Sequence, residues 1–165
     1  MIVVVMGVSG CGKTTVGQAL ADDLGWPFLD ADDFHPQANV EKMSAGTPLT
    51  DDDRWPWLDR LTNEMKAINA RGGNAVLGCS ALKQAYRDRL ARAGDVRVVY
   101  LKGDRATIEQ RLGARAGHFM PPALLTSQFA TLEEPANAVI VDVRLSAAEQ
   151  VAAIRDALSL ASSTP

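Results

Sequence analysis

The feature that most constrains this chain is a glycine-rich segment near the N-terminus, residues 7–14, which reads Gly-Val-Ser-Gly-Cys-Gly-Lys-Thr. It matches the pattern Gly-x-x-x-x-Gly-Lys-Ser/Thr in full. The apolar run 2–6 precedes it and reads as a buried strand, and an amphipathic helical pattern over 14–24 follows it. A strand, this loop and a helix in that order predict an α/β fold of the phosphate-loop (P-loop) type, in which the loop surrounds an anion.

Each position of the loop has a chemical reason. Glycines let the backbone curve until its N–H groups point at phosphate oxygens, and the helix that begins at Lys13 adds the positive end of its dipole. The Lys13 ammonium reaches the β- and γ-phosphates, and the Thr14 hydroxyl is a ligand for Mg²⁺. We therefore expect ATP and Mg²⁺ as cofactors, with the nucleotide bound by Gly7, Val8, Ser9, Gly10, Cys11, Gly12, Lys13, Thr14 and Thr15.

Short apolar runs alternate with helical patterns along the rest of the chain. The pattern predicts strands at 2–6, 27–29, 75–77, 96–101 and 138–141, and helices at 14–24, about 35–45, about 51–70, 83–90, 104–112, up to 132 and from 146 onward. This alternation predicts one three-layer α/β/α domain over residues 1–165, with a parallel sheet of about five strands. Turn-forming residues over 113–122 read as a loop, and 111–122 as a small lid.

The composition excludes several classes of protein. The formal net charge of −3 lacks the basic excess that binding to a nucleic-acid backbone usually requires. Two cysteines and two histidines, far apart in sequence, form neither a disulfide framework nor a zinc-ligand pattern. The apolar run 2–6 is too short for a signal peptide, and no run reaches the length of a membrane span. We expect a cytoplasmic protein that binds neither nucleic acid nor membrane.

Nucleotide binding alone does not distinguish a kinase from a GTPase or a mechanical ATPase. The segment 102–104, Lys-Gly-Asp, lacks the Asn-Lys-x-Asp pattern of common GTPases, and the strand at 75–77 does not end in the aspartate that many ATPases use for Mg²⁺. Asp30 and Asp32 instead follow the second strand, and the carboxyl ends of parallel strands share one ligand crevice. One of these carboxylates could serve Mg²⁺ while the other orients an acceptor hydroxyl.

Further segments, taken together with the phosphate loop, resemble the gluconokinase family. They are Phe-Leu-Asp-Ala-Asp at 28–32, His-Pro at 35–36, Asn-Val-Glu-Lys-Met at 39–43, Pro-Leu-Thr-Asp-Asp-Asp-Arg at 48–54, Cys-Ser-Ala-Leu-Lys at 79–83, Tyr-Arg-Asp at 86–88, Tyr-Leu-Lys-Gly at 100–103 and Gly-His-Phe at 117–119. Shikimate kinase and adenylate kinase are wider relatives. The resemblance implies ATP:D-gluconate 6-phosphotransferase activity, dependence on Mg²⁺ and a homodimer.

The resemblance also implies roles for residues on the acceptor side. Asp32 is expected to face the acceptor hydroxyl, Asp30 to hold a water of Mg²⁺, and Arg54 to bind the substrate carboxylate. A guanidinium suits a bidentate contact with a carboxylate, although Arg54 could instead pair with the aspartates at 51–53. Further substrate contacts are expected from His35, Lys42, Ser80, Arg87 and Gln128.

Arg111 and Arg115 fall at the end of a predicted helix and in the loop after it, an arrangement that resembles the lid of small-molecule kinases. We expect both to neutralise charge on the transferring phosphoryl group, although they could be solvated helix-end cations. His118, in the same lid, is a further candidate for substrate contact. Two alternatives remain open at this point: a kinase for another hydroxy acid such as shikimate, and a nucleotide-dependent module without an acceptor.

Overall fold

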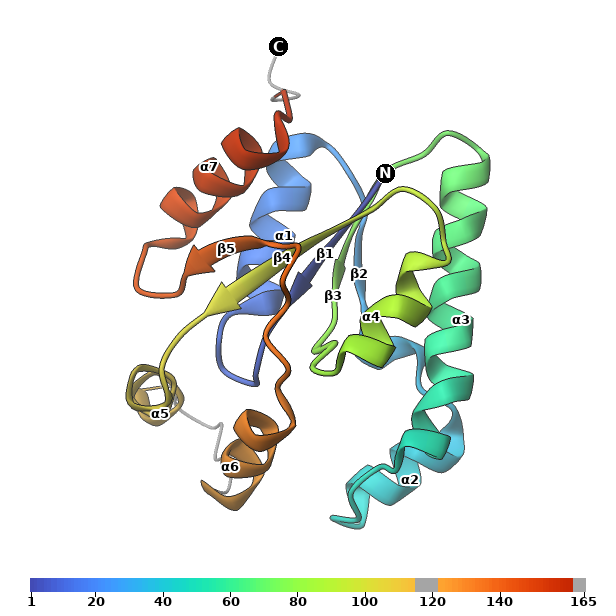
Figure 1. Ribbon diagram of the computed structural model, residues 1–165, viewed down its shortest axis with the longest axis vertical. Coiled ribbons are helices and arrows are strands. Elements are labelled where there is room, and N and C mark those ends of the chain that lie inside the picture. The colour runs from blue at the N-terminus through green and yellow to red at the C-terminus, as the bar shows by residue number, and fades with distance from the viewer. Residues whose placement is uncertain (115–121, 162–165) are drawn as a thin grey trace.

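The computed structural model, which describes residues 1–114 and 122–161, is built on a five-stranded parallel sheet (Figure 1). Its strands are β1 (Ile2–Met6), β2 (Phe28–Asp30), β3 (Ala75–Gly78), β4 (Val96–Lys102) and β5 (Val139–Asp142), in the spatial order β2-β3-β1-β4-β5. All four neighbouring pairs are parallel. The strand that precedes the phosphate loop is therefore central, and every residue of it is buried.

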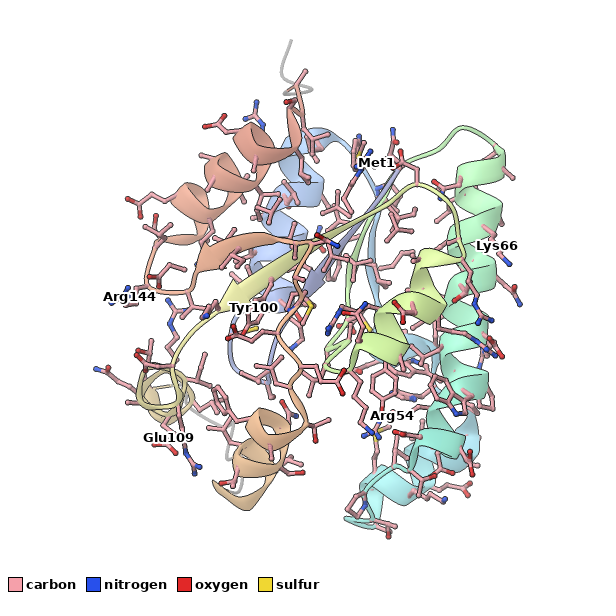
Figure 2. All side chains as sticks on the ribbon, in the orientation of Figure 1. Met1, Arg54, Lys66, Tyr100, Glu109 and Arg144 are labelled. Carbon is pink, nitrogen blue, oxygen red and sulfur yellow. The ribbon has the colours of Figure 1, made fainter. Side chains whose placement is uncertain are left out.

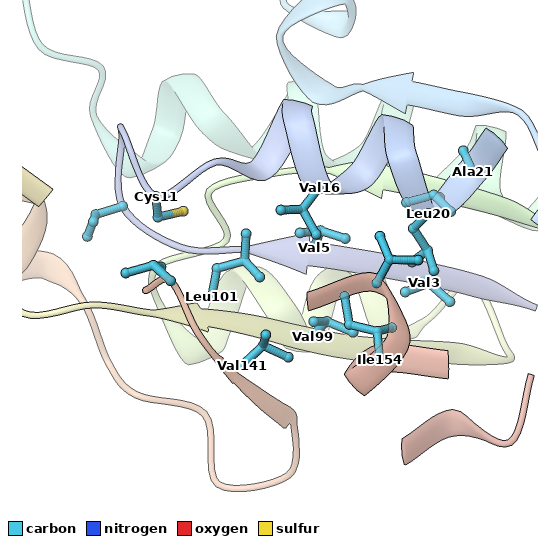
Figure 3. Close-up of a cluster of buried hydrophobic side chains, with 14 of the residues drawn as sticks. Val3, Val5, Cys11, Val16, Leu20, Ala21, Val99, Leu101, Val141 and Ile154 are labelled. Atoms are coloured by element: carbon cyan, nitrogen blue, oxygen red, sulfur yellow. The ribbon is translucent and has the colours of Figure 1, made fainter. Parts of the chain in front are cut away.

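Helices cover both faces of the sheet, as the alternating pattern predicts. They are α1 (Lys13–Leu24), α2 (Gln37–Ser44), α3 (Asp51–Ala70), α4 (Gln84–Ala91), α5 (Arg105–Ala114), α6 (Pro122–Thr131) and α7 (Ala147–Leu158), and a 3-10 turn spans Ala31–Phe34. One apolar cluster lies between the sheet and α1 with α7, and it includes Val5, Leu20, Val99 and Ile154 (Figure 3). The second cluster packs α3 and α4 against the opposite face.

The carboxyl ends of the strands all point toward one end of the molecule. In Figure 1 this end is the bottom, where α5 and α6 lie below β4 on one side and α2 lies below α3 on the other. Because β1 is central, the phosphate loop at its end lies between these two groups of helices. Among the described residues, no helix combines the length and apolarity that crossing a bilayer requires.

The predicted strands and helices are present with ends shifted by one or two residues, but residues 113, 114 and 122, which were expected in a loop, are helical. Helix α5 continues through Gly113 to Ala114, and α6 begins at Pro122. A single glycine weakens a helix by about 1 kcal/mol without ending it, and proline suits a first helical turn. The 3-10 turn after β2 was not predicted. Asp30 caps it by accepting a hydrogen bond from the Asp32 N–H at 3.0 Å.

Candidate active site

The phosphate loop presents open backbone donors at the start of α1. Gly12 is the N-cap residue of this helix, with a φ of 100° that glycine adopts at little cost, and it has no side chain to accept from the first N–H groups. Gly10 also has a positive φ of 82°, and a Cβ there would lie 2.7 Å from Leu112 of α5. The loop is therefore packed tightly against α5, and its first helical N–H groups remain available to an anion.

The side chains of the loop differ in their contacts and in their exposure. Lys13 Nζ donates to the carbonyl oxygens of Gly7 and Val8, each at 3.1 Å, so the ammonium lies folded across the loop. Thr14 and Thr15 are exposed in the first turn of α1. Cys11 is fully buried, and burial raises the pKa of its thiol, which stays protonated and serves as a small core residue.

The turn after β2 brings two aspartates toward solvent, beside a histidine whose side chain is buried. Asp32 and Asp33 are exposed, while Ala31 between Asp30 and Asp32 is buried and accepts a hydrogen bond from Trp57 Nε1 at 2.7 Å. The His35 ring stacks on Trp57 with centroids 4.3 Å apart, and only 5% of the His35 side chain is exposed. Trp57 thus fixes both the backbone of the turn and the plane of the imidazole.

The contacts of Asn39 determine which nitrogen of His35 carries the proton. Asn39 Nδ2 donates to the Asp53 carbonyl at 2.9 Å, which identifies it as the amide nitrogen, and it lies 3.3 Å from His35 Nδ1. Nδ1 must therefore accept, and a neutral ring carries its proton on Nε2. Nε2 lies 3.9 Å from Asp32 Oδ1. Burial lowers the pKa of His35 against the opposing effect of Asp32, which favours this neutral form at pH 7.

The charge of Asp32 is perturbed by its surroundings. The protein around the turn displaces part of the water near the carboxylate, and repulsion from Asp30 adds to this effect, so the pKa of Asp32 is raised. His35 and Lys13 act in the opposite direction. The influence of Lys13 places the phosphate loop and Asp32 in one electrostatic site. A carboxylate with a raised pKa beside a phosphate loop is suited to accept a proton from an attacking hydroxyl.

A second polar group lies where α3 and α4 meet. Arg54 Nη1, which can only donate hydrogen bonds, donates to the Tyr86 hydroxyl at 3.3 Å. The same nitrogen lies 3.8 Å from Asp51 Oδ1. Arg54 could therefore either bind a substrate carboxylate or pair with the aspartates at 51–53. It lies within ion-pair distance of Asp51, but the contact is too long to be a hydrogen bond. The positive charge of Arg54 also contributes to the lowered pKa of His35, which places this guanidinium on the same side of the site.

Other expected substrate contacts have partners within the protein. Lys42 Nζ binds both oxygens of Asp53, at 2.7 and 2.8 Å, and thereby joins α2 to α3. Ser80 is partly buried beside the loop, and its carbonyl accepts from the Gly7 N–H at 3.4 Å. The Lys42 ammonium is therefore already engaged within the protein, and the backbone of Ser80 is joined to the phosphate loop.

Arg87 does not have the free guanidinium that substrate binding would require. It is 5% exposed, and its nitrogens donate to the carbonyls of Ala81, Leu82 and Glu133 and to Gln84 Oε1, all at 2.8–3.0 Å. These bonds brace the turn in which Ala81 adopts a φ of 44°, a conformation that is unfavourable for an L-residue. Its surroundings therefore favour a structural role, contrary to the sequence expectation.

The opposite side of the phosphate loop is bordered by the helices on either side of the expected lid. Arg111 Nη2 donates to the Val143 carbonyl after β5, and the charge of Arg111 affects Cys11 in the loop. Gln128 of α6 was expected to contact substrate, but its Oε1 accepts from the Ser9 N–H at 2.6 Å and so holds α6 against the loop. Arg115 and His118 lie outside the described residues.

The segments quoted from the sequence contain Asn39, Asp51 and Tyr86, but sequence reasoning did not predict that these three residues support the site. Asn39 is 4% exposed, and a polar residue at a buried helical position is a signal that could have been noticed. Asp51 and Tyr86 meet across 35 residues of sequence through a hydrogen bond from the phenol to the carboxylate. No local pattern reports such a pairing.

The fold and the loop together define the class of protein. P-loop small-molecule kinases share three features with this structure. They have a parallel sheet with a phosphate loop after its central strand, an aspartate at the end of a strand on one side of the loop, and an arginine-bearing helix on the other side. A family model described as an AAA domain matches residues 2–135.

Individual relatives narrow this class. The chain is 54% identical to a gluconokinase of Gluconobacter oxydans, over 81% of this chain and 76% of the relative, and 45% identical to the thermoresistant gluconokinase of Escherichia coli, over 86% and 84%. A solved gluconokinase structure from Sinorhizobium meliloti is 44% identical, has a TM-score of 0.87 and matches 95% of this chain and 90% of that chain. The chain belongs to the gluconokinase family.

Proposed function

We propose that this protein transfers the γ-phosphoryl group of ATP to the 6-hydroxyl of D-gluconate. The observation that carries the proposal is the position of Asp32, held beside a neutral His35 and within electrostatic reach of Lys13, in a chain whose relatives are named gluconokinases. A nucleotide-dependent module without an acceptor has no use for such a carboxylate. Residues 1–165 act as one kinase domain, with the lid at about 111–122.

The donor side of the reaction follows from the loop. Backbone N–H groups at the start of α1 bind the phosphates, and Lys13 exchanges its two carbonyl partners for the β- and γ-phosphates. The Thr14 hydroxyl and the Asp30 carboxylate supply oxygen donors of the kind that Mg²⁺ prefers. Among the described residues no three acidic, histidine or cysteine side chains are grouped so that they could hold a metal ion by themselves. When bound, Mg²⁺ neutralises charge on the phosphates.

On the acceptor side, Asp32 takes the proton of the 6-hydroxyl as the new P–O bond forms and the bond to ADP breaks. Because Nδ1 is engaged by Asn39, the Nε2–H of His35 is directed toward Asp32, where it acts through its dipole at 3.9 Å rather than through a hydrogen bond. Arg54 binds the carboxylate of gluconate at the other end of the substrate, and its fork geometry fixes the direction in which the acid lies. Lys42, Ser80 and His35 border the polyol, and Gln128 acts through the phosphate loop.

The remaining parts of the proposal concern the lid and the assembly. Arg111 releases the Val143 carbonyl and joins Arg115 in neutralising the transferring phosphoryl group, and His118 is a further substrate contact. The enzyme acts in the cytoplasm as a homodimer.

A coupled assay of ADP release tests the function. Gluconate, shikimate, glycerate and a nucleoside monophosphate are compared at saturating ATP and Mg²⁺, with Lys13→Ala as the inactive control. We expect turnover with gluconate to exceed that with each other acceptor by at least two orders of magnitude, on the order of the discrimination that a site built for polar groups provides. A preference for another acceptor, or ADP release that ignores the acceptor, contradicts the proposal.

A further inference from the structure

The N-terminus of α3 and the start of α4 are joined by a cluster of four side chains, those of Asp51, Arg54, Lys83 and Tyr86. Asp51 accepts two hydrogen bonds from Lys83 Nζ, at 2.9 and 3.0 Å, and a third from the Tyr86 hydroxyl. Arg54, one turn further along α3, donates to the same hydroxyl. Figure 2 places Arg54 at the end of the molecule where α2, α3 and α4 approach one another.

Tyr86 is the centre of this cluster. Its phenol has one proton, which it gives to Asp51, and so the hydroxyl oxygen must act as the acceptor for Arg54. Donation to a carboxylate polarises the phenol and makes its oxygen a better acceptor. The ring is 4% exposed and packs edge-on against Trp55, with centroids 5.7 Å apart, so the hydroxyl has a fixed position.

The same contacts keep Arg54 from being captured by its neighbour. A guanidinium next to a free carboxylate forms a bidentate pair, which would occupy the donors that a substrate carboxylate needs. Here Lys83 and Tyr86 donate hydrogen bonds to Asp51, and Arg54 Nη1 forms an ion pair with it at 3.8 Å without a hydrogen bond. Among the described residues Tyr86 is the hydrogen-bond partner of Arg54, through one of its five N–H donors. The other donors remain available.

We propose that Tyr86, held by Asp51 and Lys83, is a positioning residue that presents the Arg54 guanidinium to the carboxylate of the acceptor. It thereby sets the preference of the enzyme for sugar acids over uncharged polyols. This inference rests on the proposed function, since it assigns the carboxylate of gluconate to Arg54.

The test is Tyr86→Phe, which removes the hydroxyl and keeps the ring that packs against Trp55, Arg54 and Lys83. Tyr100→Phe is the matched control, because Tyr100 is also buried, at 3% exposure, and its hydroxyl lies 3.4 Å from Glu134, away from Arg54 (Figure 2). Kinetics are measured with gluconate, with ATP, and with D-glucitol, which has a hydroxymethyl group in place of the carboxylate, as substrate or competitive inhibitor.

Loss of one hydrogen bond predicts that Tyr86→Phe raises KM for gluconate about three- to tenfold. kcat and KM for ATP should stay within about twofold, and the preference for gluconate over D-glucitol should fall by the same factor as KM rises. Tyr100→Phe should change none of these quantities. Equal effects of the two variants, or equal losses for gluconate and D-glucitol, overturn the inference.

A second variant covers the case in which Tyr86→Phe does not fold. Lys83→Met leaves Asp51 with fewer partners, so Asp51 should pair with Arg54 and compete with the substrate. KM for gluconate should again rise at least threefold, with D-glucitol unaffected, and no rise overturns the inference. Two failures can be distinguished. If the wild-type enzyme phosphorylates another acceptor but not gluconate, the proposed function itself is refuted. If the wild-type enzyme prefers gluconate and neither substitution changes its KM for gluconate, only the inference about Tyr86 is refuted.

Discussion

Replacing Asn39 by alanine should damage catalysis more than its distance from the phosphates suggests. The amide nitrogen of this buried side chain donates to His35 Nδ1 at 3.3 Å and to the Asp53 carbonyl at 2.9 Å. Two neutral hydrogen bonds at about 0.5–1.5 kcal/mol each predict a loss of about 1–3 kcal/mol in the free energy of unfolding. Urea denaturation measures this loss.

The catalytic effect has a different origin from the loss of stability. Without Asn39 the imidazole can exchange its protonated nitrogen, and the Nε2–H is no longer fixed toward Asp32. If the transition state loses about 1–1.5 kcal/mol of stabilisation because the imidazole is no longer oriented, kcat falls about five- to tenfold. KM for ATP should not change, because the phosphate loop has no contact with Asn39 among the described residues.

Asn69→Ala is the control that separates the two effects. Asn69 is also in a helix and donates to a backbone carbonyl, that of Ala93, at 3.0 Å. It lies 16 residues beyond Asp53 in α3, or about 24 Å along the helix axis at 1.5 Å per residue. Both variants should lose stability, and only Asn39→Ala should lose kcat. An unchanged kcat in folded Asn39→Ala, or an equal loss in Asn69→Ala, would refute the orientation of His35 by Asn39.

Three further outcomes follow from the same geometry. Asp32→Asn should lower kcat by about 10²–10⁴-fold, while Asp30→Asn should raise the Mg²⁺ concentration needed for half-maximal rate. If excess Mg²⁺ rescues Asp32→Asn and not Asp30→Asn, the two roles are reversed. Arg54→Lys should weaken gluconate binding by about 1.5–3 kcal/mol in calorimetry with little effect on ATP, and equal losses for both would contradict its assignment. The pKa of Asp53 is lowered from 3.8 to about 2, first by its hydrogen bond with Lys42. A lowered carboxyl pKa stabilises the fold above pH 3.8, and this stabilisation is lost as pH falls through 2. The urea midpoint of the wild type should therefore decline between about pH 4 and pH 2, and Asp53→Asn should make this decline shallower. Parallel curves for the two proteins would exclude this contribution.

The sequence predicted the parts of the protein that depend on local pattern. The phosphate loop, the buried strand before it and the helix that begins at Asp51 each need only a few neighbouring residues, and all three are present. The boundary at Gly113 was wrong because a propensity of about 1 kcal/mol does not outweigh the packing of α5 through Ile108 and Leu112.

The residues whose surroundings differ from expectation are those with distant partners. Gln128 meets Ser9 across 119 positions, and Arg87 meets Glu133 across 46. Their chemical type was compatible with substrate binding, yet the fold satisfies them with backbone groups. A family pattern identifies which residues matter, and only the tertiary contacts distinguish a side chain that touches the substrate from one that holds the site together.

The order of strands in the sheet explains how one fold can separate the donor from the acceptor. β1 is central, so the phosphate loop stands between β3 and β2 on one side and β4 on the other. Asp32 follows β2, and Arg54 and Tyr86 lie on α3 and α4, which share one apolar cluster on a single face. The arginine of α5 and the glutamine of α6 approach the loop from the β4 side. Substitutions on α3 and α4 can therefore change the acceptor without disturbing the phosphates. Because Arg54 and Tyr86 lie on packed helices, their substitution should be expressed in the affinity for the acid, whereas changes at Asp32 and at the loop should be expressed in the rate of transfer.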